Sequence, residues 1–120
     1  MAYQNAKGIR RLVNAFRFSM KGFRACFKHE EAFRQEVYAS IVVIPLGIWL
    51  GETGLERAVL VGSWMIVPLT ELLNSAVEAA IDRIGPERHK LSGRAKDIGS
   101  AAVLFSLVLA ASVWGLLLLT

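Results

Sequence analysis

Three stretches of the chain are apolar on nearly every face and long enough to cross a lipid bilayer, which takes roughly 20 helical residues. They cover about residues 33–50, 55–81 and 98–119, and the third holds no charged side chain. Helices of soluble proteins rarely stay apolar all round over such lengths. The pattern therefore predicts an all-α membrane protein with three transmembrane helices.

A different pattern occupies the N-terminal segment, about residues 6–28. Its polar side chains recur in steps of three and four, with apolar side chains between them. This spacing predicts an amphipathic helix, and the polar face is mostly Lys and Arg. Such a helix lies along a membrane surface and is attracted to anionic lipid. A basic helix that docks on a partner protein is the alternative.

Charged side chains gather outside the apolar stretches. Residues 1–36 carry eight Lys or Arg and three acids, and residues 82–97 carry five Lys or Arg and three acids. Because basic loops tend to stay in the cytoplasm, both segments are expected there, and the N-terminus with them. The chain is expected to form a single domain, residues 1–120, and no signal peptide is recognised.

Polar side chains interrupt the second apolar stretch on one face. With Glu71 at zero degrees on an α-helix, Asn74, Glu78 and Asp82 fall within roughly an 80° arc. A charged group at the bilayer centre costs roughly 2.5–3.5 kcal/mol on insertion scales, so such groups normally face protein or a water-filled cavity. Glu78 and Asp82 also fit a simple place at the water interface. Glu71 lies roughly 15 Å from the cytoplasmic loop and is the stronger functional candidate.

The residue types in and after this stretch favour phosphate chemistry. A carboxylate shielded from water suits a general base acting on an alcohol. Two further carboxylates near the interface suit Mg²⁺, which prefers oxygen ligands and shares them with phosphates. The following loop adds basic side chains, together with Gly85, Gly93 and Gly99, which allow close backbone approach. The combination predicts phosphoryl transfer, although neither common glycine-rich nucleotide motif occurs.

Three segments carry a resemblance to a known family: EAFRQE at 31–36, ELLNSAVEAAIDRIG at 71–85 and HKLSGRAKDIGSAAV at 89–103. They resemble the bacterial integral-membrane diacylglycerol kinases, and the similarity extends over essentially the whole chain. It implies a homotrimer with active sites shared between protomers, placed in the bacterial inner (cytoplasmic) membrane. It also implies that MgATP phosphorylates diacylglycerol to phosphatidate for phospholipid recycling. The expected partners are ATP, diacylglycerol and the bilayer, with no nucleic acid.

The resemblance also implies roles for single residues. Glu71 matches the catalytic base, and Asn74 is expected to orient groups near it. Glu30 and Glu78 match the carboxylates that bind the metal, expected to be Mg²⁺. Positions that match nucleotide contacts are Arg11, Phe18, Glu30, Glu78, Glu87, Arg88, His89, Lys96 and Asp97. Positions that match lipid contacts are Arg11, Ala15, Phe16, Arg17, Phe18, Ser19, Met20, Arg24, Phe33, Arg34, Glu36, Trp49, Glu52, Glu71 and Ser100.

Three positions depart from the family pattern. Phe18 stands where a tyrosine is expected, so a hydroxyl contact to the nucleotide is lost there. Pro45 and Pro68 fall inside predicted transmembrane helices, where each removes an internal hydrogen bond. These two prolines put the helix geometry in doubt, and the chemistry is expected to be unchanged.

Other functions fit parts of the pattern. Undecaprenol kinases share the ExxNxxxE core but act on a polyprenol, whereas LSGRAKDIGSAAV is more similar to the diacylglycerol enzymes. A small proton- or ion-coupled transporter would also use an intramembrane carboxylate such as Glu71. It is disfavoured because only one span is expected to carry buried charge. An accessory membrane subunit whose carboxylates pair between helices is the third alternative.

Overall fold

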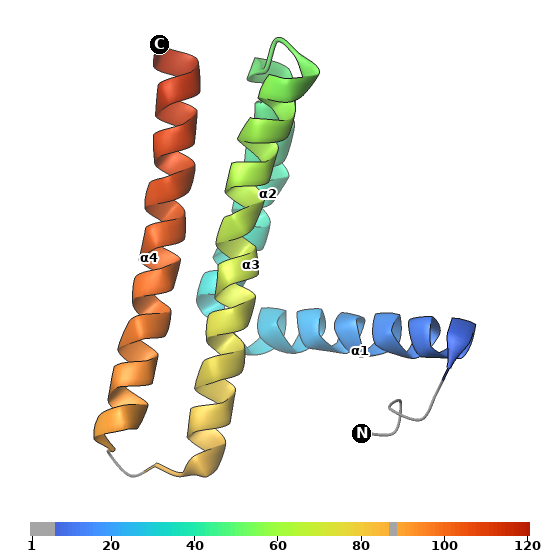
Figure 1. Cartoon of the computed structure of the whole chain (residues 1–120), viewed down its shortest axis with the longest axis vertical. Helices are drawn as coiled ribbons and strands as arrows, with labels where there is room; N and C mark the ends of the chain where they lie inside the picture. Colours follow the sequence, from blue (N-terminus) through green and yellow to red (C-terminus); the bar gives the residue numbers. More distant parts are fainter. Residues whose placement is uncertain (1–6, 87–88) are drawn as a thin grey trace.

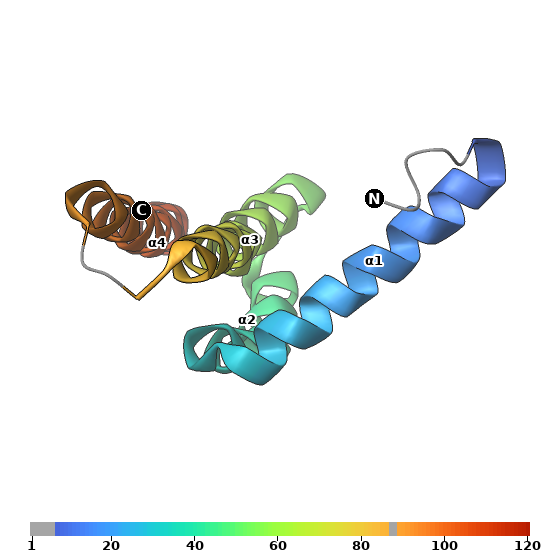
Figure 2. The ribbon, with the colours of Figure 1, turned by 90° about the horizontal axis from the view of Figure 1, so that it is seen from below.

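The computed structural model describes residues 7–86 and 89–120, and these form four α-helices. They are α1 (Gly8–His29), α2 (Glu31–Leu50), α3 (Gly54–Ile84) and α4 (Lys90–Leu119). The last three run side by side along the long axis, and α1 projects sideways from this bundle (Figure 1, Figure 2). The prediction of an all-helical protein is confirmed.

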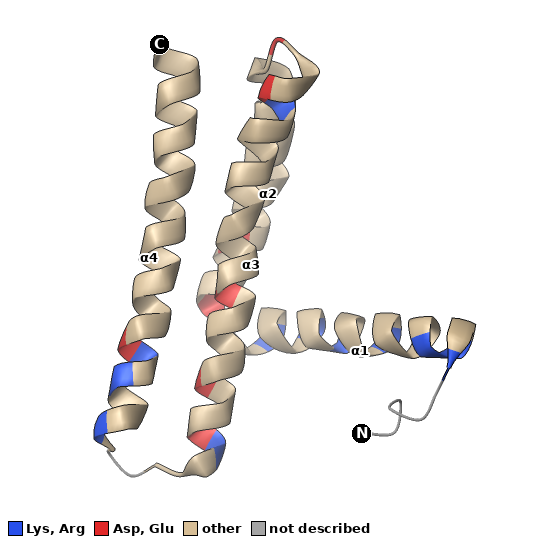
Figure 3. Ribbon diagram, viewed as in Figure 1, with Lys and Arg blue, Asp and Glu red and all other residues tan. Residues whose placement is uncertain are grey.

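Helices α2, α3 and α4 are each long and apolar enough to cross a membrane, so the prediction of three membrane-length apolar helices is confirmed. Both α3 and α4 reach beyond their apolar stretches, because the charged residues at their lower ends are helical too (Figure 3). The N-terminal segment is helical as α1. Its place on a membrane surface stays a prediction.

Helix α3 lies at the centre of the bundle and packs against both α2 and α4. Leu60 and Val67 of α3 are fully buried in these contacts. Two indoles join the helices: Trp64 Nε1 donates to Ser40 Oγ at 2.8 Å, and Trp114 Nε1 donates to the Leu60 carbonyl at 3.0 Å. A bilayer core offers no water, so polar groups there need partners within the protein. These two bonds meet that need and tie α3 to both neighbours.

The two prolines do not end their helices. Pro45 lies inside α2 and Pro68 lies inside α3, and both helices continue past them. Membrane helices tolerate proline because neighbouring groups satisfy the freed backbone carbonyls. Both helices are therefore continuous through their prolines.

The turn between α2 and α3 is held by Arg57. Its Nε donates to the carbonyls of Ile48 at 3.0 Å and Gly51 at 3.2 Å. Thr53 caps α3, since its hydroxyl accepts from the Glu56 backbone N–H at 3.1 Å. A Cβ added at Gly51 would lie 2.6 Å from Arg57 Cγ and 2.9 Å from the Arg57 backbone nitrogen. Glycine is therefore required at position 51 for the turn to close.

Replacing Gly51 by alanine should destabilise the bundle, because Arg57 would have to move and its bonds to α2 would weaken. Overpacking of this kind costs about 1–3 kcal/mol. The effect should appear as a lower thermal-unfolding midpoint of the protein in detergent. Gly54→Ala is the matched control in the same turn, since no atom lies within 4 Å of its added Cβ. Equal midpoints for the two variants would contradict the packing described at Gly51.

Candidate active site

Two carboxylates and one amide are buried together inside the bundle. Glu71 of α3 is 5% exposed, and Glu36 of α2 and Asn74 of α3 are each 9% exposed. Asn74 Nδ2 donates to Glu71 Oε2 at 3.5 Å. The carboxylate of Glu36 lies close enough to Glu71 for their charges to interact. Glu71 therefore faces protein, as expected of a charged group within a membrane-length helix.

This buried group contains acceptors that still need a donor. Within the described part of the chain, Glu36 Oε1 and Asn74 Oδ1 are buried and have no hydrogen-bond partner. Leaving a buried polar atom unpaired costs about 1–3 kcal/mol. The buried group is thus rich in acceptors and short of donors, so a hydroxyl group that enters it finds several oxygens, those of Glu71 among them, to which its O–H can donate.

Helix α4 closes over the same group through Gly99. A Cβ added at position 99 would collide with Asn74 Oδ1, so the α4 backbone approaches this amide closely. Gly93, also expected to permit close approach, has no atom within 4 Å of its added Cβ. Of these two glycines in α4, Gly99 is the one that the structure requires.

A second group of carboxylates lines a cavity of about 610 Å³ between α1 and α3. Glu30, the single residue between α1 and α2, lines this cavity together with Glu78 and Asp82 of α3. Burial raises the pKa of the Glu30 carboxyl, and the negative charge of Glu78 raises it further. Cys26 and Ser75 line the same cavity, and Cys26 Sγ donates to Ser75 Oγ at 3.4 Å, which joins α1 to α3.

The donor set of this cavity fits a magnesium ion that shares its ligands with phosphate. Glu30, at the corner between α1 and α2, and Glu78 of α3 supply carboxylate oxygens from two different parts of the chain. Across residues 7–86 and 89–120, no three His, Cys, Asp or Glu side chains come close enough to hold a metal ion by themselves. Mg²⁺ typically uses one or two carboxylates and completes its shell with water and substrate phosphates.

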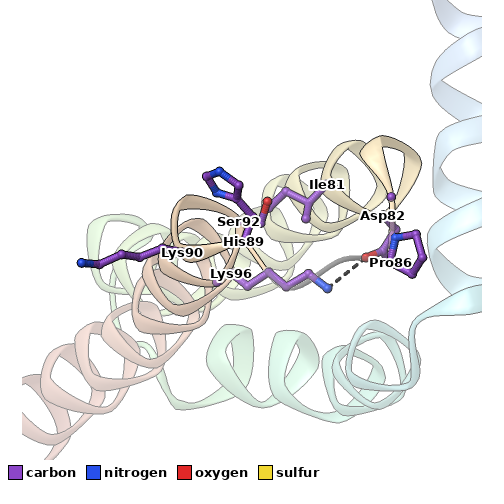
Figure 4. A pocket seen from close by; sticks show the side chains of 9 residues that line it. Ile81, Asp82, Pro86, His89, Lys90, Ser92 and Lys96 are labelled. Atoms are coloured by element: carbon purple, nitrogen blue, oxygen red, sulfur yellow. Dashed lines mark hydrogen bonds and ion pairs between the residues drawn. The ribbon is translucent and has the colours of Figure 1, made fainter.

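A second cavity, of about 590 Å³, lies where α3 ends and α4 begins. Lys96 Nζ of α4 pairs with Asp82 Oδ1 of α3 at 2.9 Å across it (Figure 4). Gly85 ends α3 with φ +154°, a conformation that is essentially restricted to glycine. Asp82 lines both this cavity and the carboxylate cavity, so the two are neighbours. The residues around it are Ile81, Asp82, Gly85, Pro86, His89, Lys90, Ser92, Gly93 and Lys96.

The remaining site residues expected from the sequence are spread over the chain. Glu87 and Arg88 lie outside the described residues. Phe33 is buried in α2, and Asp97 and Ser100 are exposed on α4. Trp49 and Glu52 lie at the α2–α3 turn, far along the bundle from α1 (Figure 1). The positions on α1 are exposed except for half-buried Met20, and they are Arg11, Ala15, Phe16, Arg17, Phe18, Ser19 and Arg24.

Two features of the site were not expected from the sequence. The expectation that only one span carries buried charge is wrong, since Glu36 is buried in α2 beside Glu71 of α3. A second acid inside a predicted span was the available signal. Arg34 is engaged within the protein, because its Nη1 donates to two backbone carbonyls of α1. No periodicity in the sequence points to that contact.

Comparison with known proteins gives a consistent result. A family described as prokaryotic diacylglycerol kinase matches residues 17–118. A diacylglycerol kinase of Haemophilus influenzae is 48% identical over 108 residues, which cover 90% of this chain and 92% of that protein. One from Escherichia coli K12 is 46% identical and covers 95% and 93%, and one from Pseudomonas aeruginosa is 41% identical and covers 98% and 95%.

The contact between Gly99 and Asn74 can be tested by a double-mutant cycle. Gly99→Ala should cost about 1–3 kcal/mol of stability, because the new methyl group displaces the Asn74 amide. The same substitution should cost much less in an Asn74→Ala background, where the colliding oxygen is absent. Thermal midpoints in detergent measure both steps. Gly115→Ala, with no atom within 4 Å of its added Cβ, is the control on the same helix.

If Gly99→Ala lowers the midpoint equally in both backgrounds, position 99 is sensitive for a reason other than Asn74.

Proposed function

The chain belongs to the prokaryotic diacylglycerol kinase family, and we propose that it transfers the γ-phosphoryl group of ATP to the free hydroxyl of diacylglycerol. It is a lipid kinase of a bacterial membrane, in keeping with its relatives and its three membrane-length helices. The observation that carries the proposal is the burial of Glu71 beside acceptor oxygens that lack a donor. The names of the relatives favour diacylglycerol over a polyprenol, and a kinase over a transporter.

Glu71 acts as the general base. The O–H of diacylglycerol donates to this carboxylate. Asn74 Nδ2 donates to Glu71 Oε2 and so holds the carboxylate in place. As the lipid oxygen attacks the γ-phosphorus, its proton passes to Glu71 and the bond to the β,γ-bridging oxygen breaks in line. Phosphatidate and ADP are the products. Positioning and electrostatics supply most of the acceleration in such reactions.

Glu30 and Glu78 would hold the magnesium ion that accompanies ATP. When bound, the ion neutralises negative charge on the phosphates. Burial and the charge of Glu78 both disfavour ionisation of Glu30, and a bound divalent cation would relieve the repulsion between the two carboxylates. The pair is thus prepared for a divalent cation.

The basic cavity between α3 and α4 receives the phosphates of the nucleotide. Lys96 pairs with Asp82 there, and both side chains are exposed to solvent, so a triphosphate can compete for the ammonium group. His89 and Asp97 stay proposed nucleotide contacts at the start of α4. Because Asp82 belongs to both cavities, phosphates in one lie beside the carboxylates of the other.

We propose a homotrimer with shared sites, as the family resemblance implies, and the shape of a single chain supports an oligomer. The outer half of α1, which carries Arg11 and Phe18, extends away from α2, α3 and α4 (Figure 1, Figure 2). A neighbouring protomer would bring a nucleotide within its reach, and closed cyclic symmetry is the usual form of such an assembly. Helix α1 then lies along the cytoplasmic face of the inner membrane, where the enzyme recycles diacylglycerol.

Glu71→Gln should reduce phosphorylation of diacylglycerol by about 10²- to 10⁴-fold, the usual contribution of a general base. The KM for MgATP should stay near its original value, because the side chain does not bind the nucleotide. Transfer of label from ATP to lipid in mixed micelles measures both quantities. Glu56→Gln, at the other end of α3, is the control and should keep its turnover. A fully active Glu71→Gln enzyme would exclude Glu71 as the base.

Glu30→Gln and Glu78→Gln should each raise the Mg²⁺ concentration needed for half-maximal activity by about tenfold or more, since each removes a metal ligand. Chelation of the ion should abolish activity in all variants, and added Mg²⁺ should restore it. Binding of Mn²⁺, followed by electron paramagnetic resonance, checks the same ligands without turnover. Glu31→Gln, next to Glu30 and exposed, is the control. An unchanged metal requirement would remove both carboxylates from the metal site.

A further inference from the structure

Arg34 of α2 reaches back to the end of α1. Its Nη1 donates to the carbonyls of Phe27 and Lys28, both at 2.8 Å. These carbonyls belong to the last turn of α1, where backbone acceptors lack partners inside the helix. A guanidinium is also attracted to the negative end of the helix dipole. Arg34 therefore caps α1 from the following helix by charge-assisted hydrogen bonds.

Glu30 occupies the corner that Arg34 spans. Its backbone is extended, with φ −114° and ψ 109°, so the chain changes direction at this residue. The Glu30 N–H donates to the Cys26 carbonyl at 2.8 Å, and the Glu30 carbonyl accepts from the Arg34 N–H at 3.2 Å. Arg34 thus binds the last turn of α1 through its side chain, and it binds the Glu30 carbonyl at the start of α2 through its backbone N–H.

The direction of the Glu30 carboxylate depends on this corner. Glu30 shares its cavity with Glu78, and Arg34 is not among the described residues that line it. Two other contacts also hold α1: the Phe27 ring meets the Tyr38 ring edge-on at 5.9 Å, and Cys26 bonds to Ser75. Neither contact satisfies the two carbonyls that Arg34 caps. Loss of the guanidinium would leave those carbonyls unpaired and loosen the corner.

We propose that Arg34 is a positioning residue for Glu30: by capping α1 it holds this carboxylate facing Glu78 across the metal-binding cavity. The proposal rests on the metal-binding role proposed above for Glu30. It assigns Arg34 an effect on the binding of the divalent cation, whereas a lipid contact would affect the KM for diacylglycerol.

The first test separates metal binding from lipid binding. Arg34→Ala should weaken Mn²⁺ binding about tenfold and raise the Mg²⁺ requirement equally, a change typical of lost support behind a metal ligand. The KM for diacylglycerol should not change. Arg34→Lys keeps a charged donor, so its Mn²⁺ affinity should lie between those of Arg34→Ala and the unaltered protein. Arg83→Ala removes the same charge from the lower end of α3 and should match the unaltered protein.

The second test measures the corner itself. In a Cys26→Ser background, which keeps a hydroxyl donor to Ser75, spin labels at positions 12 and 104 report the distance between α1 and α4. Labelled chains are diluted with unlabelled ones so that distances within one chain dominate. The distribution should be narrow with Arg34, broad in Arg34→Ala and intermediate in Arg34→Lys.

Three results with the Arg34 variants would overturn the proposal. A raised KM for diacylglycerol with unchanged Mn²⁺ binding would make Arg34 a lipid contact. A broadened distance distribution with unchanged Mn²⁺ binding would show that the corner does not serve the metal site. An unchanged distribution would show that Arg34 does not hold α1. If the unaltered protein neither binds Mn²⁺ nor phosphorylates lipid, the proposed function fails, and the positioning role of Arg34 fails with it.

Discussion

The carboxylate of Glu71 lies inside the bundle, where its charge is shielded from water, and much of the surrounding structure follows from keeping it there. Its helix, α3, must be covered on the polar side, and α2 and α4 both pack against it. Asn74 supplies a hydrogen bond to the carboxylate, and Gly99 lets α4 approach the amide closely. A larger residue at position 99 would push α4 or the amide away. A buried charge on one helix thus dictates which side chains the other helices bring to it.

The two polar cavities are joined by the same helix. Descending α3, the polar stripe passes from Glu71 through Glu78 to Asp82, which lines both cavities. The carboxylates of one cavity and the basic side chains of the other therefore share a boundary, as a metal-bound polyphosphate requires. Glu30 joins this boundary only because α1 turns sharply into α2. The path of α1 is for this reason part of the site's geometry.

The sequence predicted what depends on local spacing. Apolar length alone indicated three membrane helices, and the helical positions of Glu71, Asn74, Glu78 and Asp82 indicated one polar stripe. Contacts between helices were beyond such reasoning. Glu36 meets Glu71 only after α2 and α3 pack, so its burial was missed. Arg34 likewise contacts the carbonyls of α1 only because the chain turns at a single residue. The helical periodicity on either side of that residue does not predict the turn.

The balance of donors and acceptors explains why this site suits the removal of a proton. Glu36, Glu71 and Asn74 bring carboxylate and amide oxygens together, and the Asn74 amide nitrogen is the donor already used within the group. Glu36 Oε1 and Asn74 Oδ1 have no hydrogen-bond donor among the described residues. An alcohol that enters brings one O–H into surroundings rich in acceptors and shielded from water, where hydrogen bonds and charges act more strongly. In the proposed reaction, such surroundings would draw the proton toward the carboxylate of Glu71 and leave the lipid oxygen ready to attack phosphorus.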